Sequence, residues 1–94
     1  MNIIKERLPL IELLCGLAEE ASELSQAALK LRRVFDGTNP TPVTEEQAIE
    51  RLYEEIADTF LYIRQIDINF QNVENIIAEK KRRWEKRLEE ISHD

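Results

Sequence analysis

The chain has 94 residues, of which 34% are charged and 43% hydrophobic, with two glycines and three prolines. These numbers exclude a disordered chain and favour one helical domain, whose limited core makes a partner subunit plausible. The net charge of −6 excludes a general nucleic-acid coat, because phosphate backbones are bound mainly through an excess of Lys and Arg.

The cellular setting follows from two further features of the sequence. No apolar stretch approaches the roughly 20 residues that span a bilayer, and the first residues carry no signal-peptide pattern. The single cysteine, Cys15, has no partner for an internal disulfide and lies in the apolar run LIELLCGLA, so we expect it to be reduced and structural. We therefore expect a cytoplasmic protein that binds neither nucleic acid nor membranes.

A long helix is predicted to begin at Leu8-Pro9, because the residue before a proline disfavours the α region and proline suits the first turn. A short helix over 2–7 can precede it. Apolar residues then recur at intervals of three and four, which marks one stripe of a helix. They are Leu10, Leu13, Leu14, Leu17, Ala21, Leu24, Ala28, Leu31 and Phe35. Asp36-Gly37 ends this helix, and the segment DGTNPTPVT is the one obvious loop.

Two further helices follow the loop. Thr44 and Gln47 form a capping box for the second, which should end near Asp67, and Asn69 can cap a third that runs to the C-terminus. The apolar positions are Ile49, Leu52, Tyr53, Ile56, Phe60 and Ile63 on the second helix, and Val73, Ile77, Trp84, Leu88 and Ile91 on the third. The predicted fold is all-α, an antiparallel bundle of three main helices in a single domain over 1–94.

Two pairs of carboxylates lie beside these apolar stripes. At about 100° per residue, Glu20 and Glu23 share one flank of the first helix, roughly 60° apart. Glu55 and Asp58, within YEEIADTF, repeat this spacing on the second helix. If the helices pack antiparallel, the pairs meet across the interface, where like charges repel strongly without a cation. The pattern therefore indicates a metal site.

The residue types narrow the choice of metal. Di-iron bundles use Glu-x-x-His pairs and zinc sites use His or Cys, whereas the one histidine here is His93, next to the C-terminus. Oxygen ligands alone favour Mg²⁺, with Mn²⁺ as a substitute. Mg²⁺ bound by a few carboxylates usually takes its other ligands from water and substrate phosphates, so the pattern points toward phosphate chemistry.

The third helix carries a basic run within AEKKRRWEKRL. Lys80, Arg83 and Arg87 are spaced to share one face, which could hold a triphosphate against the metal. The interleaved glutamates also allow a solvated face with i, i+4 ion pairs. Trp84 continues the apolar stripe, so packing in a core or interface competes with stacking on a base.

In this order, Glu19-Glu20-x-x-Glu23, Glu55-x-x-Asp58 within EEIAD and the basic run around Trp84 closely resemble the MazG-like all-α nucleoside triphosphate pyrophosphohydrolases. The likeness runs from about residue 14 to 88. It implies Mg²⁺-dependent hydrolysis of a (deoxy)nucleoside triphosphate between the α and β phosphates, giving the monophosphate and pyrophosphate in a housecleaning role. It also implies a homodimer or homotetramer in which a partner subunit completes the bundle.

The resemblance also implies a role for each motif residue. The metal ligands would be Glu20, Glu23, Glu55 and Asp58; the catalytic set would be Glu19, Glu20 and Glu55; and the phosphate-binding residues would be Lys80, Arg83 and Arg87. Glu19 would assist as a ligand or as an acceptor for the attacking water. The asparagine that some members carry in the basic motif has no counterpart in KKRRWEKR.

Two other functions stay open. The same charges could form interhelical ion pairs in a non-catalytic interaction module, or the site could bind nucleotide as a sensor with negligible turnover. Glu19 and Glu54 can equally face solvent. Tyr62 lies near the carboxylate side of its helix, where it could line a nucleotide pocket.

Overall fold

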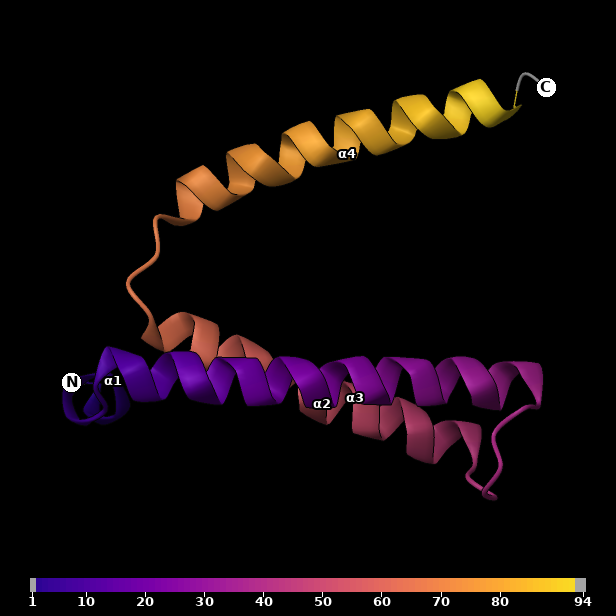
Figure 1. The fold of residues 1–94 in the computed structure, drawn as a ribbon, viewed down its shortest axis with the longest axis horizontal. Coiled ribbons are helices and arrows are strands. Elements are labelled where there is room, and N and C mark those ends of the chain that lie inside the picture. Colours follow the sequence, from indigo (N-terminus) through magenta and orange to yellow (C-terminus); the bar gives the residue numbers. More distant parts are fainter. Residues whose placement is uncertain (1, 93–94) are drawn as a thin grey trace.

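The computed structural model describes residues 2–92, and all regular structure in that range is α-helical. Four helices follow one another: α1 (Ile3–Arg7), α2 (Leu10–Asp36), α3 (Glu45–Gln65) and α4 (Phe70–Ser92). The expected all-α class is confirmed, as is the short helix before Pro9. Figure 1 shows α2 and α3 as an antiparallel hairpin, with α4 leaving it as a separate arm.

The helices begin and end close to the predicted turn signals. Gly37 adopts a left-handed φ of 77°, and the N–H groups of Gly37 and Thr38 donate to carbonyls of the last turn of α2. Thr44 and Gln47 form both hydrogen bonds of the capping box, each 3.1 Å long. Asn69 accepts a hydrogen bond from the N–H of Asn72 at 3.0 Å, which caps α4. The predicted continuation of this helix over 93–94 lies outside the described residues.

The hairpin core is built from small side chains. Leu13, Ala27 and Ala48 are the buried apolar residues of the described chain, and Gly16 is buried with them. A Cβ atom at Gly16 would overlap the ring of Tyr62 and lie 2.7 Å from its hydroxyl oxygen. Glycine therefore lets α2 and α3 approach closely at this level, because any larger residue would displace the tyrosine.

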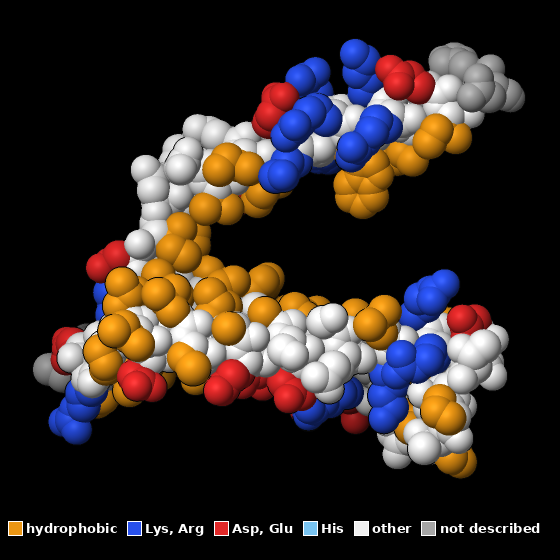
Figure 2. All heavy atoms as spheres, in the orientation of Figure 1, with side chains coloured by type: hydrophobic (Ala, Val, Ile, Leu, Met, Phe, Trp, Pro, Cys, Tyr) orange, Lys and Arg blue, Asp and Glu red, His pale blue; other side chains and the backbone are white. Residues whose placement is uncertain are grey.

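Much of the predicted apolar stripe is exposed. Leu10 and Phe35 on α2 expose 56% and 61% of their surface, and Trp84 on α4 exposes 62%. Figure 2 shows hydrophobic side chains gathered on the hairpin surface nearest α4 and along the side of α4 that faces the hairpin. The predicted three-helix bundle is not formed within one chain. The extended backbone at Ile66 leads α4 away, so that α2 and α3 are the described helices that pack extensively together.

None of the described helices combines the length and the apolar character needed to cross a membrane.

Candidate metal centre

The antiparallel packing of α2 and α3 sets the middle of one helix against the middle of the other. Thr59 lies at this level, between the two helices. Its hydroxyl donates to the carbonyl oxygen of Glu55 at 2.8 Å, one turn earlier on α3, and lies 3.4 Å from the carbonyl oxygen of Glu20 on α2. Near this level, the carboxylates of Glu20 on α2 and Glu55 on α3 lie close to each other.

The structure brings together three of the four predicted ligands. Carboxylate oxygens of Glu20, Glu55 and Asp58 all lie within 4.8 Å of one another. Glu55 is buried, with 3% of its surface exposed, whereas Glu20 is half-buried and Asp58 is exposed. The cluster is thus closed on the side of the hairpin core and open to solvent on the other, so small ligands can reach it.

One oxygen of the buried carboxylate has no partner. Oε1 of Glu55 forms an ion pair with Nη2 of Arg51 at 2.9 Å. Oε2 is buried without a hydrogen-bond donor among the described residues. A buried charged oxygen left in this way costs at least about 1–3 kcal/mol. It is the atom of the cluster that a cation would stabilise most.

The electrostatics of Glu20 report the same crowding of negative charge. Its partial burial, together with the neighbouring charges of Asp58, Glu55 and Glu23, raises the pKa of the Glu20 carboxyl above its ordinary value of 4.5. Without a cation, Glu20 is therefore harder to ionise than a free glutamate, and a divalent cation would favour its ionised form.

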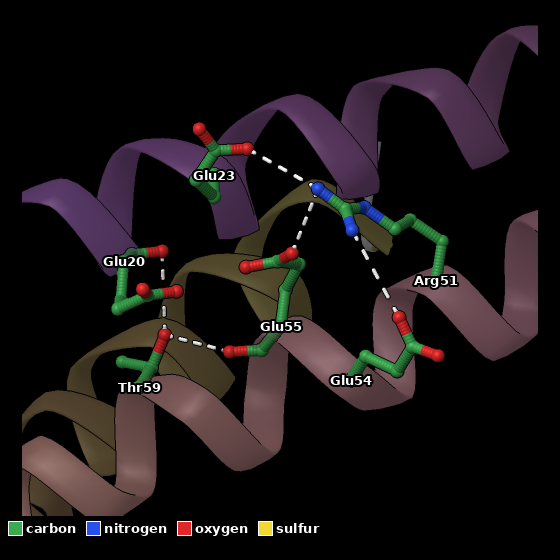
Figure 3. A network of polar contacts seen from close by, with 6 residues as sticks. All are labelled: Glu20, Glu23, Arg51, Glu54, Glu55 and Thr59. Carbon is green, nitrogen blue, oxygen red and sulfur yellow. Dashed lines mark hydrogen bonds and ion pairs between the residues drawn. The ribbon is translucent and has the colours of Figure 1, made fainter.

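Arg51 also lies at the site, although the sequence pattern did not identify it as a site residue. Figure 3 shows its guanidinium between the carboxylates of Glu23, Glu54 and Glu55. It donates to Glu23 at 3.3 Å and to Glu55 at 2.9 Å, and lies 3.8 Å from Glu54. Glu23 is thus turned toward Arg51 and lies outside the three-carboxylate cluster. The available signal was the i, i+4 spacing from Arg51 to Glu55, which favours an ion pair on a helix.

Two other predicted residues lie at the edge of the site. Glu19 is exposed, and its carboxylate accepts a weak hydrogen bond from the thiol of Cys15 at 3.9 Å. Cys15 itself is free and exposed. The ring of Tyr62 packs on Gly16 and is half-buried, so it contributes to the contact between α2 and α3.

The basic residues form a separate feature on α4. Lys80, Arg83 and Arg87 lie with Trp84 and Leu88 on the exposed surface of this helix, where their side chains border a shallow, open depression. Arg83 lies 3.8 Å from a carboxylate oxygen of Glu79, while Lys80 and Arg87 make no ion pair within residues 2–92. In a single chain these basic residues lie on the α4 arm and the carboxylates lie on the hairpin.

Comparisons of the chain with protein-family models, with curated proteins and with solved structures find no match. The candidate centre is therefore interpreted from its own chemistry and from the resemblance of its motifs.

Proposed function

We propose that the chain is a MazG-like, Mg²⁺-dependent nucleoside triphosphate pyrophosphohydrolase that cleaves between the α and β phosphates. The observation that carries this proposal is the buried carboxylate of Glu55. Among the described residues, one of its oxygens lacks a hydrogen-bond partner, and oxygens of Glu20 and Asp58 lie within 4.8 Å. Three acidic oxygens without a nitrogen or sulfur ligand suit a hard cation such as Mg²⁺ or Mn²⁺.

The residues present are compatible with such a cation. Glu20, Glu55 and Asp58 would hold it, and Glu23 could join them by leaving Arg51. Exposure of Asp58 leaves one side of the cluster free for water and phosphate oxygens. When bound, the cation would neutralise charge on the phosphate oxygens and lower the pKa of a water molecule.

The chain's own residues supply position and charge. Burial of Glu55 restricts its carboxylate to the space between α2 and α3, beside Glu20 and Asp58. Glu19, on the exposed side of α2, is assigned as the acceptor for the proton of the attacking water or as a further ligand, with Glu20 and Glu55 completing the catalytic set.

A second copy of the chain is part of the proposal. Large hydrophobic side chains are exposed along both the hairpin and α4 (Figure 2), and contiguous apolar surface of this kind is typical of an interface. A homodimer or homotetramer would cover them by laying the α4 arm of one subunit on a hairpin, which would bring Lys80, Arg83 and Arg87 toward the carboxylates to hold the triphosphate. A cytoplasmic housecleaning role fits this activity.

The test is product analysis. Purified protein is incubated with Mg²⁺ and a panel of canonical and modified nucleoside triphosphates, and pyrophosphate is separated from orthophosphate. We expect monophosphate plus pyrophosphate, lost in Glu55→Gln. The matched control is Glu54→Gln, which removes the adjacent exposed carboxylate and should retain most turnover. Release of orthophosphate, or no turnover of any nucleotide, would contradict the proposal.

Arg51 favours a second candidate. Its ion pairs with Glu23 and Glu55 neutralise part of the cluster without a metal, as expected for a non-catalytic helical interaction module. A thermal melt separates the two, because a ligand of the native state raises the melting temperature. Mg²⁺ or Mn²⁺ should stabilise the enzyme and leave the module unchanged. Nucleotide binding without turnover would instead identify a sensor.

A further inference from the structure

We infer that Arg51 is the internal counter-ion of the carboxylate cluster, and that a divalent cation gains its full ligand set by displacing the Arg51 guanidinium. The inference rests on the proposed metal centre and assigns a positioning residue that controls access to it. Without the cation, Arg51 links α2 to α3 through Glu23 and Glu55. When the cation binds, Arg51 has to release these carboxylates, because the guanidinium and the cation compete for them.

The contacts of Arg51 support this competition. The same nitrogen, Nη2, lies 3.3 Å from Glu23 and 2.9 Å from Glu55, so one guanidinium edge joins the two helices (Figure 3). Both partners belong to the predicted ligand set, and the side chain of Glu55 is only 4% exposed. A guanidinium and a divalent cation held by the same carboxylates would repel each other, most strongly beside a buried oxygen.

The guanidinium also has space to leave. About half of the Arg51 side chain is exposed. It lines an open groove of about 450 Å³ at the loop end of the hairpin, together with Lys30 and Gln47. A flexible arginine can turn into this groove without repacking the hairpin core, so the exchange requires a side-chain rotation only.

The consequence is a trade between stability and metal affinity. Arg51 stabilises the metal-free protein by offsetting the repulsion within the cluster, and it weakens cation binding by the same contacts. Removing it should therefore lower the melting temperature of the metal-free chain and tighten the binding of a divalent cation.

Binding of Mn²⁺ to the full chain, followed by the electron paramagnetic resonance signal of the free ion at neutral pH, tests this inference. For Arg51→Gln we expect a dissociation constant lower by about fivefold, the scale set by loss of a competing ion pair. We also expect a lower melting temperature without metal and a larger rise on adding Mn²⁺. The matched control is Arg64→Gln, which removes the same charge from α3 on the side opposite Glu55 and should change neither quantity.

Each outcome decides the inference. Unchanged or weaker Mn²⁺ binding by Arg51→Gln would overturn it, since Arg51 would then only orient the carboxylates. If this variant does not fold without metal, Arg51→Met keeps the apolar stem without the charge and should still bind Mn²⁺ more tightly than the wild type; equal or weaker binding again overturns the inference. Failure of the wild type to bind Mn²⁺, or equal binding by Glu55→Gln, would remove the proposed metal centre itself and the inference with it.

Discussion

The helices of the α2–α3 hairpin and the α4 arm all have an apolar and a polar face, but they differ in what covers the apolar face. The hairpin packs through Gly16 and small apolar residues and encloses a polar site, whereas every described side chain of α4 is exposed. In proteins, most of the stability of a helix comes from packing of its amphipathic face rather than from helix propensity. The difference teaches that caps and periodicity determine where a helix forms, while a second surface is needed to bury its apolar face.

Turnover should separate the two regions most strongly. If the proposed activity is correct, Glu55→Gln on the hairpin should lower kcat/KM by on the order of 10³-fold, because it removes the buried carboxylate of the proposed metal centre. Arg83→Gln on α4 should lower kcat/KM only about tenfold, mainly through KM, because it removes one of several proposed phosphate contacts. Steady-state pyrophosphate release at saturating Mg²⁺ measures both. Equal losses would erase the proposed division between a metal-binding hairpin and a phosphate-binding arm.

Subunit association tests what covers the arm. Trp84→Ala should weaken self-association by about 2 kcal/mol, or roughly 30-fold, if its exposed ring is a central contact with a second copy. Lys86→Ala on the same helix is the control and should change association little. Sedimentation velocity over a range of protein concentrations gives the dissociation constants. A wild-type chain that stays monomeric at all concentrations would show that the arm is covered in another way.

Unfolding tests the close packing that α4 lacks. Gly16→Ala should lower the free energy of unfolding by about 1–3 kcal/mol, because the added methyl group collides with Tyr62. Ser22→Ala, at an exposed position of the same helix, should be neutral or slightly stabilising through helix propensity. Urea titrations of both variants make the comparison. If Gly16→Ala is as stable as the wild type, the approach of the two helices does not depend on the glycine.

The smallest expected effects are pH dependences of opposite sign. In the folded chain the pKa of Glu20 is raised by partial burial and by nearby carboxylates, whereas a hydrogen bond from Arg82 lowers the pKa of Glu79 on α4. The contribution of Glu20 to the free energy of unfolding should therefore be fully present below its ordinary pKa of 4.5. It should be lost as the pH rises through the raised pKa of the folded chain. The contribution of Glu79 should be present above its ordinary pKa and be lost as the pH falls through the lowered one.

Denaturant unfolding from about pH 3 to about pH 7, the range in which carboxyl groups titrate, measures both pH dependences. Glu20→Gln should remove the loss at rising pH, and Glu79→Gln should remove the loss at falling pH. Mg²⁺ should also cancel the contribution of Glu20 while leaving that of Glu79 unchanged. The same sign for both residues would contradict the contrast between crowded and paired carboxylates.

Local signals predicted the helices well because their chemistry is local. The capping box of Thr44 and the left-handed turn at Gly37 depend on residues within one turn, and both form as expected. The predicted bundle was not confirmed, because periodicity shows that α4 has an apolar face without specifying what covers it.

The site was predictable to the extent that helix geometry determines it. Spacing and antiparallel packing bring Glu20, Glu55 and Asp58 together. The orientation of Glu23 could not be obtained in this way, because it depends on which rotamer Arg51 adopts and on competition among several carboxylates for one guanidinium. The phosphate-binding assignments on α4 remain predictions.

The contact between Gly16 and Tyr62 has a consequence for how the sequence can diverge. A residue larger than glycine at position 16 becomes acceptable only when the ring at position 62 is replaced by a smaller side chain. The two positions, 46 residues apart in sequence, should therefore vary together in descendants of this chain. A substitution at 16 alone displaces the tyrosine ring and one at 62 alone leaves a gap beside the glycine, so either single change costs stability that the paired change restores.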